Sequence, residues 1–453
     1  MLTWIAQPER APGTIVATIA ALFTIAYSLG LLLLAKPDGR IVVGDAMHQY
    51  VQLRSAVFDR DLRFTNDYLH LYGLTPQTID DETRWIIETN ATGHVRNLMP
   101  VGPALLWAPA FLLTTAGVWL VDHAGWHYPL DGYGRLFQAS AGYTGIAAAA
   151  IAAWLSYLTA AAFFDRRTAI WATLAIWLGS SAVYYSVISP AYSHAPSMLA
   201  VSVFCFAWIR TRGRQTLGRY AVLGGLAGIA ALMRWQDAIL LIVPAIEAGA
   251  SIRRDGWLAA VARISMSVAC ALAAFTPQMF VWQRLYGHPL TIPQGAAFMQ
   301  WRQPALVAVL FSDNHGLFTW TPVIALACLG LVPLVRRAPL VGVGCIAFLA
   351  ISWYVNAAVA DWWAGEAFGA RRFVGCFPVF VLGMAAVYDG WRTHPARIAG
   401  CTAVFVALTF LLLVQYQVFM HGARAIAPYP KGFEGLWLAR FVVPFRLLHH
   451  LVK

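Results

Sequence analysis

The stretch GTIVATIAALFTIAYSLGLLLLA, residues 13–35, contains no charged residue and is long enough to cross a lipid bilayer as a helix. It is too long for the core of a signal peptide, and the AKPDGR in which it ends has no small-x-small cleavage pattern, so we expect a retained first span. Hydrophobic residues make up 59% of the 453-residue chain, and mean hydropathy is +0.61. The sequence therefore predicts an all-α, polytopic integral membrane protein rather than a soluble domain.

Short basic clusters separate the apolar segments. The positive-inside rule places all of them on the cytoplasmic side, which explains the net charge of +11 without a nucleic-acid partner. The clusters are FFDRRT (163–168), RTRGRQTLGR (210–219), IRRDG (252–256), VRRAP (335–339) and WRTHPAR (391–397). The apolar segments between them lie at 13–35, 136–163, 168–188, 196–209, 219–233, 238–250, 258–282, 321–335, 339–356, 373–389 and 398–420.

This alternation predicts one transmembrane domain over residues 1–453, with about eleven transmembrane helices and the N-terminus inside. Residues 36–134 form a long first external loop with juxtamembrane helices, and residues 421–453 form an external amphipathic tail broken by Pro444. The six cysteines are dispersed through apolar segments without CxxC spacing, so we expect packing roles for them.

One apolar stretch, Pro100 to Val121, does not fit as a span. A single crossing there would move every basic cluster to the outside, so we expect a re-entrant element, an interface-lying element or a hairpin. Pro100, Pro103 and Pro109 lie in this stretch, and we expect them to prevent a continuous regular helix.

The run GDAMHQYVQLRSAVFDRDLRF (44–64) follows the first span and concentrates charge in a chain with 12% charged residues. Its apolar residues recur at helical spacing and leave a polar face that includes Asp45 and His48, which predicts an amphipathic helix on the outer membrane surface. Asp45 is either a simple N-terminal cap or a carboxylate presented to a lipid-linked substrate. Both interpretations stay open at this stage.

The other chemistry-bearing residues fall in predicted external loops. Paired arginines at an outer span entry run against the positive-inside bias, and an anionic partner would explain them. Arg234 either pairs with Asp237 or points into a cavity, while interfacial tryptophans alone would form an ordinary aromatic belt. The candidates are His194, Arg234, Arg302, Asn314, His315, Trp362, Trp363, Glu366, Arg371 and Arg372.

These features resemble the glycosyltransferase C superfamily, in particular bacterial relatives of protein O-mannosyltransferases and aminoarabinose transferases. The resemblance is carried by GDAMHQYVQLRSAVFDRD after the first span, by NLMPVGPALLWAP (97–109), by the basic-loop pair that begins at FFDRRT, and by the late loops with HGLFTWTP and WWAGEAFGARRF. It implies an enzyme of the bacterial inner (plasma) membrane whose active site faces the periplasm or exterior.

The resemblance implies transfer of a sugar from a polyprenyl-phosphate carrier to a hydroxyl of a glycan, lipid or protein acceptor. Asp45 corresponds to the acidic residue of the first external loop, the implied base, but Ala46 stands where many relatives have a second acid. We expect Glu366, with Asp361 and Asp313 as alternatives, to supply it. The arginines and His315 would bind the leaving phosphate, Trp362 and Trp363 would stack on sugar or isoprenoid, and a single displacement would invert the anomeric centre.

Carboxylates at a phosphate site can attract Mg²⁺ or Mn²⁺, but no spacing of ligand residues assigns a metal, so we predict no definite cofactor. The competing interpretations are a lipid-linked glycan transporter or flippase, a ligase for assembled glycans, and an inactive scaffold. A transporter would carry ionisable residues near the bilayer midplane, and the sequence shows no clear charge there.

Overall fold

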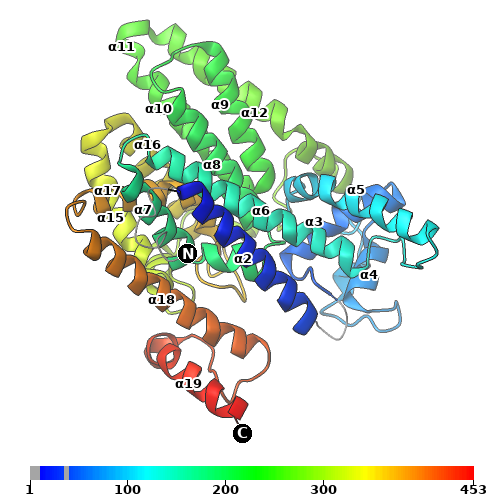
Figure 1. Cartoon of the computed structure of the whole chain (residues 1–453). Coiled ribbons are helices and arrows are strands. Elements are labelled where there is room, and N and C mark those ends of the chain that lie inside the picture. Colours follow the sequence, from blue (N-terminus) through cyan, green and yellow to red (C-terminus); the bar gives the residue numbers. More distant parts are fainter. Residues whose placement is uncertain (1–10, 35–39, 453) are drawn as a thin grey trace.

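The computed structural model describes residues 11–34 and 40–452, and within these ranges it is a bundle of helices without β-strands (Figure 1). The only pairings of extended chain there are the isolated bridges Thr89–Val95 and Met299–Val359. The α-helices are α2 Pro12–Leu33, α3 Asp45–Arg54, α4 Thr65–Tyr72, α5 Gly102–His123, α6 Arg135–Ala160, α7 Arg166–Gly179, α8 His194–Arg210, α9 Leu217–Met233, α10 Ile242–Ala250, α11 Ile252–Asp255, α12 Trp257–Tyr286, α13 Leu306–Phe311, α14 Leu317–Trp320, α15 Pro322–Arg337, α16 Pro339–Ala357, α17 Phe377–Asp389, α18 Pro395–Met420 and α19 Ala439–Val452.

Short 3₁₀ and π segments complete the helical structure: η2 Ser55–Asp59, η3 Arg84–Ile86, η4 Tyr184–Ile188, η5 Trp235–Leu241, η6 Ala296–Phe298, η7 Arg371–Cys376 and η8 Glu434–Leu438. Each predicted apolar segment contains a helix, which confirms the all-α membrane fold. In the described ranges seven helices are long and apolar enough to cross a membrane: α2, α5, α6, α12, α16, η7 with α17, and α18. The number of eleven crossings stays a prediction, because α7, α8, α9, α10 and α15 are shorter.

The five predicted basic clusters lie together at one end of the bundle, which we call the basic side. Arg212 lies over the Phe163 ring at 4.6 Å, and Arg337 lies over the Phe164 ring at 4.8 Å. Arg337 also donates to Asp389 at 2.9 Å, next to the last cluster. Arg263 donates to both the Gln215 carbonyl and Asp255, so it joins the second and third clusters.

The opposite end, which we call the loop side, gathers the long connections. α2 and α6 are antiparallel there, because Tyr27 meets Tyr143 at 5.4 Å and Arg135 donates to the Leu31 carbonyl. Figure 1 shows α3 and α4 at the far end of the bundle from α11. All candidate site residues of the sequence belong to this side or to the loops that cover it.

The segment 100–121 forms one continuous helix, so the prediction that its prolines prevent a regular helix is wrong. Pro103 is at the first turn of α5, where its missing N–H is not needed, and Pro109 removes only one backbone hydrogen bond. The backbone of Gly102 touches the Leu232 carbonyl at the end of α9, and Val121 shares a groove with Leu31. The two ends of α5 therefore lie near the C-terminal ends of α9 and α2.

α3 is helical as predicted, but it is not a surface helix. Most of its residues are buried, including Gln52, which belongs to the predicted polar face with Asp45 and His48. Gln52 donates to the Met99 carbonyl at 3.1 Å, and Asn97 donates to the His48 carbonyl at 2.7 Å. The segment 97–99 lies over α3 and supplies its hydrogen-bond partners. The sequence pattern predicted water in this place.

The tail also differs from expectation at Pro444, because α19 runs through this residue without a break. The proline ring removes one hydrogen bond to the carbonyl of Arg440. Phe441 and Phe445 on α19 are exposed, whereas Arg440 and Val443 are buried.

Small residues let α9 and α12 approach at backbone distance. A Cβ added at Gly224 would lie 2.1 Å from the Ser267 carbonyl oxygen, and one at Gly228 would lie 2.3 Å from that of Ala271. Helices in membranes associate through such close contacts, because lipid provides no hydrophobic driving force between them.

We expect Gly224→Leu to lower the stability of the protein by about 1–3 kcal/mol, because the new side chain must push α9 away from α12. Thermal unfolding in detergent would measure this. Gly225→Leu is the matched control, since nothing lies within 4 Å of a Cβ at Gly225. Equal melting temperatures for the two variants would contradict the close packing.

Candidate active site

Asp45 is the first residue of α3, and its carboxylate faces the C-terminal half of the chain. Its Oδ2 lies 3.1 Å from Nη1 of Arg371, and Arg371 also lies over the Tyr192 ring at 5.9 Å. In the described part of the chain Asp45 makes no hydrogen bond to the first N–H groups of α3. The interpretation of Asp45 as a simple helix cap is therefore not the one observed.

Gly44 brings this carboxylate close to Tyr192. Its backbone has φ 54° and ψ −134°, a region that residues with a Cβ rarely adopt. A Cβ at this position would lie 2.8 Å from the Tyr192 hydroxyl. Glycine thus satisfies both the turn and the close approach that set the position of Asp45.

Arg234 and His194 form the second part of the site. Arg234 Nη1 donates to Nδ1 of His194 at 2.6 Å, so this nitrogen carries no proton. Asp237 accepts from Ser197 at 2.6 Å instead of forming an ion pair with Arg234, so the predicted alternative of an Arg234–Asp237 pair is not observed. The Nε–H of Arg234 is buried without a hydrogen-bond partner in the described structure, as at a site that awaits an acceptor.

Arg371 and Arg372 begin η7 and bring two more guanidinium groups. Arg372 donates to both the side chain and the carbonyl of Asp361, each at 2.7 Å. Gly375 lets η7 lie against α8, because a Cβ there would be 2.6 Å from the Ser197 hydroxyl. The charges of Arg234, Arg371 and Arg372 act on His194 and on one another, so one small region holds three cations.

His315 connects the late loops to the tail. Its Nδ1–H donates to the Trp363 carbonyl at 2.8 Å, and its Nε2 accepts from the Tyr429 hydroxyl at 2.8 Å. Asp313 accepts from the Gly432 amide at 2.9 Å, which ties the same loop to the tail a second time. Burial lowers the pKa of His315 to about 4, so this histidine is neutral at pH 7.

Seven predicted site residues lie outside the arginine cluster: His315 and Trp363, which meet through the Trp363 carbonyl, and His48, Arg302, Asn314, Trp362 and Glu366. His48 shares a hydrogen bond with the Tyr68 hydroxyl and stacks on Trp85, and burial lowers its pKa to about 4. Arg302 is exposed, and Asn314 contacts Ser312 through its backbone. Trp362 packs against the core. Glu366 is exposed, and its charge acts on Tyr416 and Tyr429 rather than on the arginines. Of the three candidate second carboxylates, Asp361 is the one joined to the arginine cluster.

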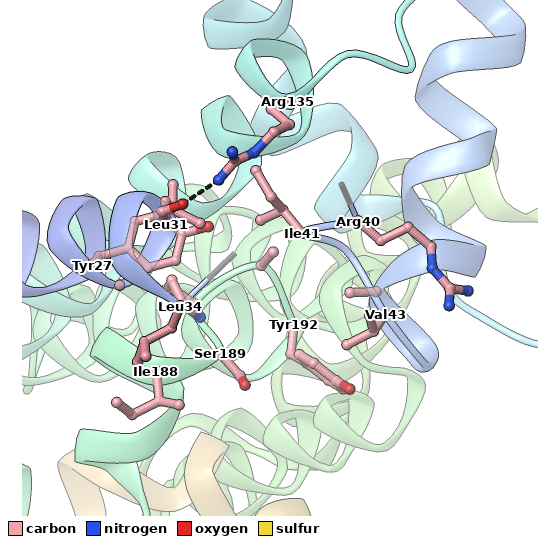
Figure 2. A pocket seen from close by; sticks show the side chains of 14 residues that line it. Tyr27, Leu31, Leu34, Arg40, Ile41, Val43, Arg135, Ile188, Ser189 and Tyr192 are labelled. Atoms are coloured by element: carbon pink, nitrogen blue, oxygen red, sulfur yellow. Dashed lines mark hydrogen bonds between the residues drawn. The ribbon is translucent and has the colours of Figure 1, made fainter. Parts of the chain in front are cut away.

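A cavity of about 120 Å³ lies between the end of α2 and the start of α3 (Figure 2). Its lining includes Ala46, the residue after Asp45, and Tyr192, whose ring lies under Arg371. Figure 2 shows Arg135 at its rim, with a hydrogen bond to Leu31, and Tyr192 on the opposite wall.

The residues around Asp45 do not fit a divalent metal. Asp45 pairs with Arg371, and Asp361 pairs with Arg372, so both nearby carboxylates already face a guanidinium group, where a metal would need several free oxygen ligands. In the described ranges no three His, Cys, Asp or Glu side chains gather as a ligand set.

Sequence reasoning did not select Gly44, Tyr192 or Gln236 as site residues. Gln236 donates to the Arg372 carbonyl at 2.7 Å and thus links η5 to η7. The glycine directly before Asp45 is a local signal that the backbone can lie close to another segment at this position. The role of Tyr192 depends on a contact between distant segments, which no local pattern contains.

The His315 contacts make a pH dependence testable. Because the folded-state pKa of about 4 lies below the ordinary value of 6.5, neutral His315 stabilises the fold fully above about pH 6.5, and this contribution is lost as pH falls toward 4. We expect the melting temperature to fall over this range in the parent and to fall less in His315→Gln. Exposed His449→Gln is the control and keeps the parent dependence. Identical pH profiles for all three proteins would contradict this role.

Comparisons with known proteins give structural similarities only. No protein-family model and no curated protein matches the chain. It is similar to the oligosaccharyltransferase AglB of Archaeoglobus fulgidus in complex with an inhibitory peptide and a dolichol-phosphate, at 15% identity and a TM-score of 0.46, over 97% of this chain and 54% of that one. It is similar to apo ArnT of Cupriavidus metallidurans at 12% identity and a TM-score of 0.46, over 97% of this chain and 75% of that one.

The apo form of the A. fulgidus oligosaccharyltransferase is a third neighbour, at 14% identity and a TM-score of 0.42, over 98% of this chain and 55% of that one. The chain thus spans about half the length of the archaeal proteins. At such TM-scores the likeness assigns no activity to this chain.

Proposed function

We propose that the chain is a membrane glycosyltransferase that moves a sugar from a polyprenyl-phosphate carrier to an acceptor hydroxyl on the outer face of the membrane. The observation that carries the proposal is the cluster of Arg234, Arg371 and Arg372, which has two paired carboxylates, Asp45 and Asp361, for three cations. Arg371 and Arg372 have carboxylate partners, whereas Arg234 forms no ion pair within the described residues. A phosphate would satisfy the remaining positive charge and the buried Nε–H of Arg234.

The proposed step is a single displacement. The acceptor oxygen attacks the anomeric carbon, its proton passes to the carboxylate of Asp45, and the bond from the anomeric carbon to the phosphate oxygen breaks with its electron pair on that oxygen. Arg371 and Arg234 stabilise the charge that develops on the leaving phosphate. One displacement inverts the anomeric centre, as in inverting glycosidases.

The transporter alternative has less support from the geometry. The buried ion pair between Arg219 and Glu247, 2.6 Å long, lies with Trp208 toward the basic side. The arginine cluster lies on the loop side. This ion pair and the arginine cluster thus lie toward opposite ends of the bundle, whereas a transporter of a charged head group would need such residues near the middle.

Asp45→Asn keeps the shape of the side chain but removes the base. We expect it to reduce sugar transfer by about 10²–10⁴-fold, and Arg371→Ala to reduce it by about 10²–10³-fold. Purified protein in nanodiscs, supplied with a panel of polyprenyl-phosphate sugars, would be assayed for transfer and for hydrolysis of the donor.

Asp81→Asn is the matched control, because Asp81 is an exposed carboxylate in the same long segment and pairs only with Arg84. It should keep the parent rate. Parent rates in Asp45→Asn, or donor binding without any turnover in the parent, would remove the assignment of Asp45 as the base.

A further inference from the structure

A second cationic centre lies on the other side of Tyr192 from the arginine cluster. An apolar groove of about 880 Å³ runs between α2, α5 and α6 on the loop side, lined by side chains such as Leu32, Val118 and Ala139. Its wall includes Arg135, which donates to the Leu31 carbonyl and forms no ion pair within the described residues. An apolar groove that ends at a guanidinium group matches the shape of an anionic lipid.

Arg135 is where three hollows meet. It lines the apolar groove, the small cavity of Figure 2 beside Tyr192, and a polar pocket of about 350 Å³. Arg40, Asp131 and Tyr133 also line the polar pocket. The wall between these spaces is fixed, because Gln138 accepts hydrogen bonds from the amides of Ile41 and Val42 at 2.8 and 3.1 Å.

We propose that the acceptor of the reaction is an anionic lipid with a hydroxylated head group, with its chain in the α2–α5–α6 groove and its phosphate on Arg135. This inference rests on the proposed function. The head group then lies in the polar pocket, and its hydroxyl approaches Asp45 through the small cavity beside Tyr192.

Two separate cationic centres would provide one counter-charge for the phosphate of each of the two substrates. The donor phosphate occupies Arg234, Arg371 and Arg372, while the acceptor phosphate occupies Arg135. Asp45 pairs with Arg371, and its neighbour Ala46 lines the small cavity that reaches Arg135. The acceptor hydroxyl passes its proton to Asp45 as it bonds to the sugar, and the donor phosphate leaves toward the arginine cluster. Placing both lipids at a single cation cluster would leave one phosphate without a counter-charge.

Photolabelling of the full chain in nanodiscs tests the site. The probes are phosphatidylglycerol with a diazirine in its acyl chain and the matching phosphatidylcholine, and labelled peptides are mapped by mass spectrometry. We expect phosphatidylglycerol to label α2, α5 and α6 about five- to tenfold more strongly, because its head group presents no cation to Arg135. Equal labelling by the two lipids would overturn the proposal.

Gly117→Trp fills the groove without a clash, since nothing lies within 4 Å of a Cβ there. Gly225→Trp, equally open but on α9, is its control. Arg135→Gln removes the charge, with exposed Arg392→Gln on the basic side as its control. Gly117→Trp and Arg135→Gln should each lose most of the phosphatidylglycerol label, whereas the controls keep it. Retained labelling in Gly117→Trp would overturn the assignment of the groove.

Donor hydrolysis separates this inference from the proposed function. If the groove binds the acceptor, Gly117→Trp keeps Asp45-dependent hydrolysis of the polyprenyl-phosphate sugar but loses transfer to lipid. Loss of hydrolysis in Gly117→Trp, in protein that melts like the parent, would mean that the groove holds the donor and would overturn the acceptor assignment. If the parent hydrolyses no donor, the glycosyltransferase proposal fails, and selective labelling still supports the anionic-lipid site.

Discussion

The ion pair between Asp45 and Arg371 joins the first long connection of the chain to the loop before α17. Other features of the site depend on this contact. Gly44 has to adopt a backbone conformation with positive φ so that Asp45 can reach past Tyr192, and Gly375 has to lack a side chain so that η7 can lie against α8. Two glycines therefore determine whether the carboxylate and the guanidinium groups meet.

The polar chemistry of the molecule is divided between two ends of the bundle, and the physical reason is the solvent. Charged groups are costly in the apolar interior of a membrane, so they gather where water or one another can compensate them. On the basic side the arginines pair with aspartates or lie over aromatic rings. On the loop side three arginines converge with fewer carboxylates than cations, and this excess of positive charge is the feature that indicates an anionic ligand.

Much of the fold could be predicted from the sequence, because the length and hydropathy of a segment and the basic clusters beside it indicate whether the segment lies in lipid or in water. Each apolar segment contains a helix, and all five basic clusters lie on one side. The exposure of α3 could not be predicted, because its polar face is covered by a segment that comes later in the chain. The continuous helix α5 was missed because prolines near a first turn cost little.

The candidate site was predicted in part. Sequence reasoning selected Asp45, His194, Arg234, Arg371 and Arg372 from their loops and residue types, and the structure brings these residues together. It could not separate them from Arg302 or Glu366, which carry similar charges at similar depths but point elsewhere. Local sequence patterns indicate the side of the membrane on which a residue lies. Whether site side chains meet depends on contacts between segments far apart in the chain.

The hydrogen bonds from Tyr429 to His315 and from Gly432 to Asp313 also bear on the order in which the molecule is made. The tail follows α18, the last long apolar helix of the chain, so a nascent protein reaches these partners only when its final helix has entered the bilayer. Until then the loop around His315 lacks its two hydrogen bonds to the tail. The ribosome therefore delivers the opening helices, with Asp45, well before the residues that organise the other wall of the site.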